Sequence, residues 1–314
     1  MRRQKTDSRY YAVSGSAVDD CCFLGVRYPE DEDFRVEEGE SWLLAARAAA
    51  DDEVEVWLVQ GTTRALNGVW RSPSGKVFIV DDTGNVFSFH RVEPNVSPRR
   101  EQHELPTSLT GIWGLDDSFV LAWGYGPRED SPVFRWDGTR WDSIGTPRMN
   151  VQSIHGCSPA EVWAVGREGR TARWDGHVWT SHPSPVQESL VSVWVTSPDE
   201  RWAVGNGGSL LEGRQQGWIR AAQSEDGWPL QAVARFQGET WIAAGAAGLL
   251  RRVGHSQRLE VVRKSFWPYA LDARGQLLMA ARDCVVSTSD GVEFESAGED
   301  TLTELREGRA LREW

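Results

Sequence analysis

The sequence predicts an all-β fold, a β-propeller of seven four-stranded blades, from three observations. A motif of apolar strands, tryptophan and glycine returns about every 40 residues along most of the chain. The 314 residues include 17 Trp and 31 Gly, an unusual abundance of Trp. Short apolar runs bounded by Gly, Asp and Pro favour strands, and almost no stretch has the spacing of a long amphipathic helix.

The clearest copy of the motif lies at 151–179. It has an apolar strand at 151–156, a second strand of sequence VWAVG at 162–166, and the sequence WDGHVW at 174–179. Neighbouring copies begin near 111, 191 and 231, and weaker ones lie near 66 and 277. His155 stands where other copies have Trp113 and Trp194, 42 residues after the first and 39 before the second. A period near 40 with four short strands per unit is typical of a propeller blade.

The repeated residue types suit such a blade. Each sheet buries both faces against its neighbours, and a large indole ring can fill the wedge between two sheets. We expect this role for the Trp residues that repeat in register: Trp113, Trp163, Trp174, Trp194, Trp202 and Trp241. Asp-Gly pairs favour tight hairpins because Gly accepts a positive φ, which predicts turns at 137–138, 175–176 and 290–291.

These copies resemble the Trp- and Gly-rich bacterial propeller repeats of the VWAVG…WDG..W type, distant relatives of Asp-box and WD-repeat propellers. The match covers about residues 64–300. The resemblance implies the fold and leaves the function open, because one such fold hosts many activities. The sequence TSDG at 288–291 lacks the Ser-x-Asp-x-Gly spacing of a true Asp-box, so sialidase-type chemistry is not implied.

We predict a disordered N-terminus at 1–9 and a single propeller domain at 10–314. Within it, residues 10–63 form a divergent acidic blade, 64–303 hold six repeats, and 304–314 are a ring-closing tail. Six blades with an N-terminal cap are the alternative. For residues 301–305 we expect a strand beside the first blade, although apolar residues at 302, 305, 311 and 314 also fit a short helix. A propeller has to close its ring to protect its sheet edges.

The charge and cysteine content narrow the class of partner and the compartment. A net charge of −12 argues against sequence-independent nucleic-acid binding. Residues 11–60 carry 13 acidic residues against three Arg, which fits either a solvated acidic face that aids solubility or a patch that steers a basic protein partner. The four Cys fit no zinc spacing, no apolar run is long enough for a membrane helix, and no secretory signal is visible, so we expect a cytoplasmic protein with reduced thiols.

No motif indicates a catalytic residue, a metal site or a cofactor, so we predict none of these. The leading hypothesis is a non-enzymatic interaction protein, a scaffold, adaptor or inhibitor that uses one face of the ring. The alternative is an enzyme, or a binder of a small ligand such as a carbohydrate or metabolite, with its site at the central channel.

Candidate binding residues come from loops after second strands and loops that enter first strands, which share one face of a propeller. Arginine and aromatic side chains dominate binding hot spots. The candidates are Tyr125, Arg128, Arg167, Asn206, Trp228, Trp267 and Arg282.

Overall fold

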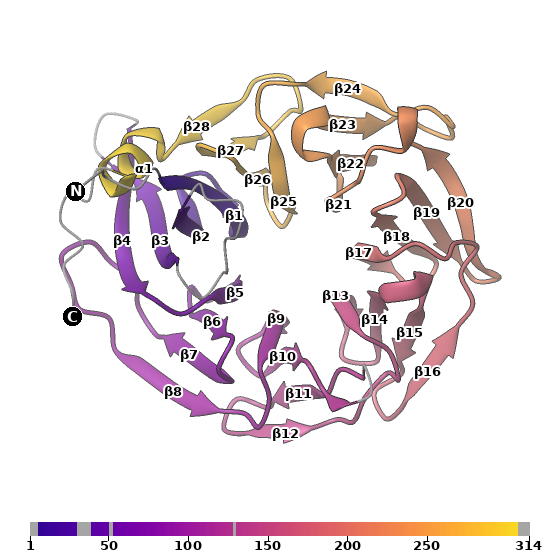
Figure 1. The fold of residues 1–314 in the computed structure, drawn as a ribbon, viewed down its shortest axis with the longest axis horizontal. Coiled ribbons are helices and arrows are strands. Elements are labelled where there is room, and N and C mark those ends of the chain that lie inside the picture. Colours follow the sequence, from indigo (N-terminus) through magenta and orange to yellow (C-terminus); the bar gives the residue numbers. More distant parts are fainter. Residues whose placement is uncertain (1–5, 30–38, 50–52, 128–129, 307–314) are drawn as a thin grey trace.

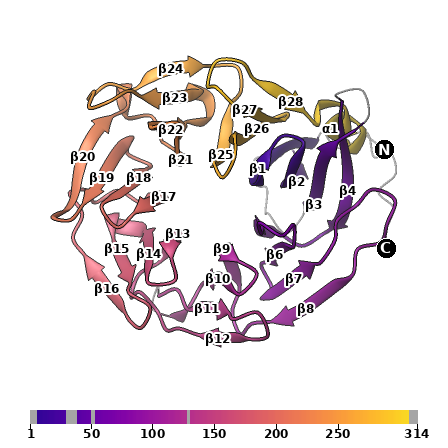
Figure 2. The same cartoon turned by 180° about the vertical axis from the view of Figure 1, so that it is seen from behind.

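The computed structural model is a ring of seven four-stranded antiparallel sheets (Figure 1), which confirms the seven-bladed β-propeller over the six-bladed alternative. It describes residues 6–29, 39–49, 53–127 and 130–306. Consecutive strands pair in chain order within every blade. The first strand of each blade lies at the centre of the ring and the fourth at its periphery, as the reverse view also shows (Figure 2).

The strands of the first four blades, in chain order, have the following bounds. They are β1 Thr6–Ala17, β2 Asp20–Pro29, β3 Glu40–Ala48, β4 Val54–Thr62; β5 Leu66–Arg71, β6 Val77–Asp81, β7 Asn85–Phe89, β8 Arg100–Glu104; β9 Leu109–Asp116, β10 Phe119–Gly124, β11 Val133–Trp136, β12 Trp141–Ser143; and β13 Val151–Ser158, β14 Glu161–Gly166, β15 Thr171–Trp174, β16 Trp179–His182.

The last three blades are followed by the α-helix of the described chain. They are β17 Leu190–Ser197, β18 Glu200–Gly205, β19 Ser209–Arg214, β20 Gly217–Gln223; β21 Ala232–Phe236, β22 Glu239–Ala243, β23 Leu249–Arg252, β24 Glu260–Arg263; and β25 Pro268–Asp272, β26 Leu277–Ala281, β27 Val285–Thr288, β28 Glu295–Ala297, with α1 at Glu299–Arg306.

Burial explains why the second strands read as continuous apolar runs. Every residue of β6, β10, β14 and β26 is buried, because these strands lie inside the sheet and each sheet is covered by a blade on both faces. The first strands β13 and β17 instead alternate buried and half-buried residues, since one side of them faces the channel. The fourth strands are largely exposed, as in β8 and β24.

Seven hydrophobic clusters form the core, and each spans the interface between two adjacent blades. The indoles of Trp163, Trp202 and Trp241 lie in these clusters and are at most 4% exposed, as predicted for wedges between blades. Trp113 and Trp194, on the first strands β9 and β17, are only partly buried against these clusters and also line the channel. They hold His155 between them, with ring centroids 5.1 and 4.3 Å away.

Glycine has a specific role beside the tryptophans and at the hairpin tips. A Cβ on Gly111 would lie 2.2 Å from the ring of Trp123, so the indole requires glycine on the paired strand. In the β11–β12 turn, Gly138 has φ +99°. The Asp137 carboxylate accepts hydrogen bonds from the backbone amides of Thr139 and Arg140. This carboxylate-capped turn is the predicted Asp-Gly hairpin.

The ring closes differently from the prediction. The first and last blades each contain four strands of their own, so no strand is shared across the closure. Residues 301–305 belong to helix α1 and not to a strand, which the apolar spacing at 302 and 305 also allowed. Leu302 and Leu305, three residues apart on one helix face, are buried against the first and last blades. Figures 1 and 2 show α1 at this junction.

Strand β1 begins at Thr6, so residues 6–9, which we expected to be disordered, belong to the first blade. Backbone and side-chain hydrogen bonds tie this strand to the last blade: Gln276 N to Ser16 O, Gly15 N to the Asp272 carboxylate, and the Tyr10 hydroxyl to Gly298 O. Residues 1–5, and residues 307–314 of the predicted tail, lie outside the described residues.

Candidate functional site

The antiparallel order of each blade places two sets of loops on one rim of the ring. The loop after each second strand and the loop entering each first strand lie together; we call this side the upper rim and the other side the lower rim. The backbone amides of Tyr125, Arg167 and Asn206 each donate to the residue before a first strand, at Ser108 O, Asn150 O and Ser189 O, over 2.9–3.1 Å. These three residues therefore occupy equivalent upper-rim positions on successive blades.

Three other candidates come together on the upper rim of the last two blades. Trp267, in the loop that enters β25, lines two cavities. It shares one of about 450 Å³ with Arg282 and the other, of about 520 Å³, with Trp228. Tyr125, Arg167 and Asn206 line neither cavity, and Arg128 lies outside the described residues.

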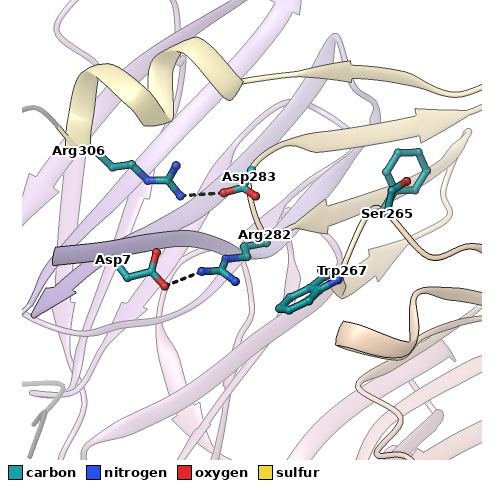
Figure 3. A pocket seen from close by; sticks show the side chains of 7 residues that line it. Asp7, Ser265, Trp267, Arg282, Asp283 and Arg306 are labelled. Atoms are coloured by element: carbon teal, nitrogen blue, oxygen red, sulfur yellow. Dashed lines mark hydrogen bonds and ion pairs between the residues drawn. The ribbon is translucent and has the colours of Figure 1, made fainter. Parts of the chain in front are cut away.

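The 450 Å³ cavity lies where the two ends of the propeller meet, and two ion pairs cross it (Figure 3). Arg282 pairs with Asp7 at 2.9 Å, and Arg306 of α1 pairs with Asp283 at 2.8 Å. The Arg282 guanidinium also lies 5.3 Å from the centroid of the Trp267 ring. A cation over an indole face is attracted by the ring quadrupole, so Arg282 holds the Trp267 side chain at the edge of the cavity.

Asp7 links the cavity to the first blade. Its Oδ2 accepts from Arg282 and, at 3.0 Å, from the Tyr28 hydroxyl. Burial and this hydrogen bond to Asp7 raise the pKa of the Tyr28 phenol, so the hydroxyl stays protonated as a donor. Asp7 therefore links β1, which carries it, to Tyr28 of β2 and to Arg282 in the loop after β26, and its negative charge neutralises that of Arg282.

The 520 Å³ cavity has a mostly apolar lining. It is lined by the short segment Ala244–Gly245–Ala246–Ala247 and by Trp228, Trp267 and Tyr269, with Lys264 as the charged residue. Small residues and aromatic rings in the lining leave room for an inserted apolar side chain. Such a pocket is typical of an anchor site in a protein interface.

The backbone of Trp267 is unusual for a bulky residue. Its φ is +48°, in the left-handed region, and its side chain is 38% exposed. Non-glycine residues in this region are strained by about 1–3 kcal/mol, and such strain concentrates at functional sites. The loop therefore holds the backbone of Trp267 in a conformation that glycine adopts more easily, and the indole of this residue is exposed.

Sequence reasoning missed six side chains at this site: Asp7, Arg9, Lys264, Tyr269, Asp283 and Arg306. Asp7 and Arg9 fall in the segment expected to be disordered, so nothing in their local pattern marked them. The Arg9 guanidinium lies 5.6 Å from the Tyr28 ring and 5.2 Å from the Tyr269 ring. The signal that could have found Tyr269 is its position next to Pro268 at the start of a first strand, directly on the upper rim.

The central channel holds a smaller cavity of about 190 Å³, lined by Trp113, His155 and Trp194 among others. The amide of Val195 donates to Nδ1 of His155, so the neutral ring carries its proton on Nε2. Burial lowers the pKa of His155 to about 4. Small-molecule sites usually offer roughly 300–1,000 Å³, so this space is small for a metabolite.

A groove of about 900 Å³ lies at the lower rim and outer edge of the closure. Its lining includes Asp19, Glu53, Glu295, Glu299 and Asp300 and no Lys or Arg. Of the 13 acidic residues at 11–60, eight fall at 30–38 and 50–52, outside the described residues. Asp19 and Glu53 of the first blade thus lie away from the aromatic upper rim, whereas Asp7 of the same blade lies at it.

The described residues contain no cluster of three or more His, Cys, Asp or Glu side chains that could share a metal ion. No helix within the described ranges is long and apolar enough to span a membrane. The four cysteines, all in the described part of the chain, are free thiols.

Comparison with known proteins supports the class, a seven-bladed β-propeller whose fold resembles WD40 and related propellers, and does not show a family. No family model matches the chain. Its sequence is 24% identical over 234 residues to the immune protein Tsi7 of Pseudomonas aeruginosa, covering 70% of this chain and 72% of that protein.

Solved structures support the fold at low sequence identity. The WD40 propeller domain of Doa1 superposes with a TM-score of 0.66 at 12% identity, over 95% of this chain and 97% of that one. Virginiamycin B lyase of Staphylococcus aureus with quinupristin gives 0.64 at 12% identity, over 94% and 95%. YCF48 bound to the D1 peptide gives 0.61 at 15% identity, over 89% and 91%.

Proposed function

We propose that this protein is a non-enzymatic inhibitor of a protein partner, which it binds through the upper rim of its first and last two blades. The observation that carries the proposal is the exposed indole of Trp267, which lines two cavities and has the Arg282 guanidinium against its ring. The backbone of Trp267 has a positive φ. Trp and Arg are the residues most enriched among binding hot spots. The similarity to an immune protein supports the inhibitory role.

We further propose that the partner carries a net positive charge. This chain has a net charge of −12, and the described acidic groove holds five carboxylates. Opposite charges accelerate encounter, and salt screens charges that lie more than a Debye length apart, about 10 Å at 0.1 M. Association with the partner should therefore slow steeply as salt rises. An association rate that does not change with salt would remove this part of the proposal.

The test starts from affinity purification of the tagged full chain from its native host. A partner retained by the wild-type chain should be lost with Trp267→Ala and kept with Tyr125→Ala, a matched aromatic truncation on the upper rim of another blade. Co-expression of the chain should then relieve whatever toxicity or activity the partner shows alone. A partner that both variants retain equally, or whose activity persists in the complex, contradicts the proposal.

The free thiols fit a reducing compartment, and on this ground we propose a cytoplasmic location. Fractionation of the native host checks it directly. An enzymatic or small-ligand site in the channel stays a prediction; a thermal-shift screen with carbohydrates and metabolites would reveal it as a rise in melting temperature.

A further inference from the structure

The charges around the two upper-rim cavities do not balance. Arg282 and Arg306 are neutralised by Asp7 and Asp283. Arg9 and Lys264 form no ion pair among the described residues, and both lie beside the 520 Å³ cavity, Lys264 in its lining and Arg9 against the lining residue Tyr269. The lining residues of the two cavities, together with Arg9, therefore carry more positive than negative charge, although the whole chain has a net charge of −12.

Arg9 is also short of hydrogen-bond acceptors. Its guanidinium stacks between Tyr28 and Tyr269, and its Nε is buried with no acceptor. Stacking orients a guanidinium and leaves its in-plane N–H groups free to donate to a carboxylate. A carboxylate accepts two such hydrogen bonds in a bidentate pair. The two tyrosine rings thus orient the Arg9 guanidinium but do not accept hydrogen bonds from its N–H groups in the plane of the guanidinium.

The cavity beside this cation suits an apolar group. Its lining includes Ala244, Gly245, Ala246 and Ala247, which have no charged side chain, together with the indoles of Trp228 and Trp267. Burying an apolar side chain there would stabilise binding, because apolar surface is removed from water. An apolar anchor and a nearby cation together define a two-part recognition site.

We propose that the segment of the protein partner that docks here pairs an apolar or aromatic residue with a neighbouring Asp or Glu. The apolar side chain fills the cavity between Trp228 and Trp267, and the carboxylate pairs with Arg9 or Lys264. This inference rests on the proposed function, because it specifies the segment of the partner that the upper rim binds. A partner that is basic overall would meet this rim with an acidic segment.

The test uses a library of short random peptides displayed on phage as the probe, selected on the full-length chain. Selection should enrich peptides with Phe, Trp, Leu or Pro next to Asp or Glu, and should not do so on the Trp267→Ala chain. A synthetic copy of an enriched peptide should lose at least tenfold in affinity when its carboxylate is replaced by the amide, measured by fluorescence anisotropy.

Single variants of the full chain then locate the site. Trp228→Ala and Lys264→Gln should each weaken the peptide at least about fivefold, and Arg9→Gln more. Arg167→Gln, which removes an exposed cation on the upper rim of another blade, is the matched control and should leave affinity unchanged. Because Lys264 is exposed, its variant keeps the test sound even if Arg9→Gln perturbs the first blade.

Several results would overturn the inference. They are a basic or uniformly polar enriched pool, no enrichment at all, equal enrichment on Trp267→Ala, or an amide peptide that binds as well as the carboxylate. Binding of single-stranded oligonucleotides in place of peptides would also overturn it. If acidic apolar peptides bind here but no host protein needs Trp267, the proposed function fails alone; if a host partner needs Trp267 but lacks such a segment, only this inference fails.

Discussion

Arg201 shows how a single charged residue is built into a blade interface. Its guanidinium lies 4.1 Å from the ring centroid of Trp163 and 5.1 Å from that of Trp218, and its side chain is buried. Its two terminal nitrogens donate to Pro198 O and Arg214 O. A desolvated cation over an indole is worth about 2 kcal/mol or more, so rings and carbonyls compensate the burial of this charge, together with the nearby Glu161 carboxylate, which forms no ion pair with Arg201.

We expect Arg201→Ala to lower the free energy of unfolding by about 3 kcal/mol, because the stack is lost and two carbonyls are left without donors. Arg251→Ala is the control: Arg251 stacks on Trp241 at 5.5 Å but is 30% exposed, so its loss should be about 1 kcal/mol. Urea denaturation of both variants measures the difference. Equal losses would show that burial of the stack does not matter.

His155 makes stability depend on pH. Its folded pKa of about 4 lies below its ordinary value of 6.5, so the unfolded chain binds more protons between these values. Stability contributed by the neutral ring is complete above pH 6.5 and falls as pH drops to about 4, by at most about 3 kcal/mol.

The variant His155→Phe keeps an aromatic ring between Trp113 and Trp194 but cannot titrate. It should be less stable than the wild-type chain at pH 7, because the Val195 amide loses its acceptor. The stability difference should shrink as pH is lowered to 4.5, as followed by urea unfolding at each pH. A difference that does not change with pH would contradict the assigned pKa of His155.

At the scale of an element, helix α1 joins the last blade to the first by packing and hydrogen bonds. Leu302 and Leu305 are buried in the cluster shared by the first and last blades. Arg306 at its end donates to Ser8 O at 2.9 Å, and Leu305 O accepts from Arg27 at 3.2 Å. The helix therefore bonds to β1 and β2 of the first blade directly after the last strand of the seventh.

We expect Leu302→Ala to lower the free energy of unfolding by about 2–4 kcal/mol, since the cavity left between two blades cannot collapse fully. Glu304→Ala, on the exposed side of the same helix, should change it by less than about 0.5 kcal/mol. Hydrogen exchange should also accelerate in β1 with Leu302→Ala. Unchanged exchange in β1 would mean that α1 does not hold the closure.

For the whole molecule, the important property is that every blade is contiguous in sequence. Propellers leave only short, protected sheet edges, and here the closure relies on side-chain packing and hydrogen bonds across one interface like the other six. The first and last described segments meet there, with Arg306 Nε 2.6 Å from the Ser8 hydroxyl. A break in the chain between any two other blades should thus be tolerated.

This predicts that a circular permutant folds. Joining residues 314 and 1 by a flexible linker and opening the exposed loop at 145–146 keeps every four-stranded sheet intact. The permutant should show the circular dichroism of the parent and a cooperative thermal transition. A matched permutant opened inside β14, between residues 163 and 164, breaks a blade and should fail to fold. If both fold equally well, blade contiguity is not what matters.

Much of the fold could be predicted because its signals are local and repeated. The buried second strands read as VWAVG-type runs, and Asp-Gly pairs mark the outer hairpins. The upper rim follows from strand order alone, so Trp228, Trp267 and Arg282 could be assigned to one face. Their meeting around Trp267 could not, because neither the ring curvature nor the path of each loop is written in the local pattern.

The sequence by itself determined the repeat of about 40 residues, most of the residues that fill the wedges and the face on which the loops gather, since the strand pattern and turn chemistry of one repeat carry these signals. It left seven blades and six blades with a cap as alternatives, and the tertiary structure decided between them. Only the tertiary structure decided how the ring closes. Closure brings Asp7 and Arg9 beside residues more than 250 positions away, Arg282 and Tyr269. The physical reason is that these contacts join opposite ends of the chain, so their geometry depends on the summed rotation of all seven blades.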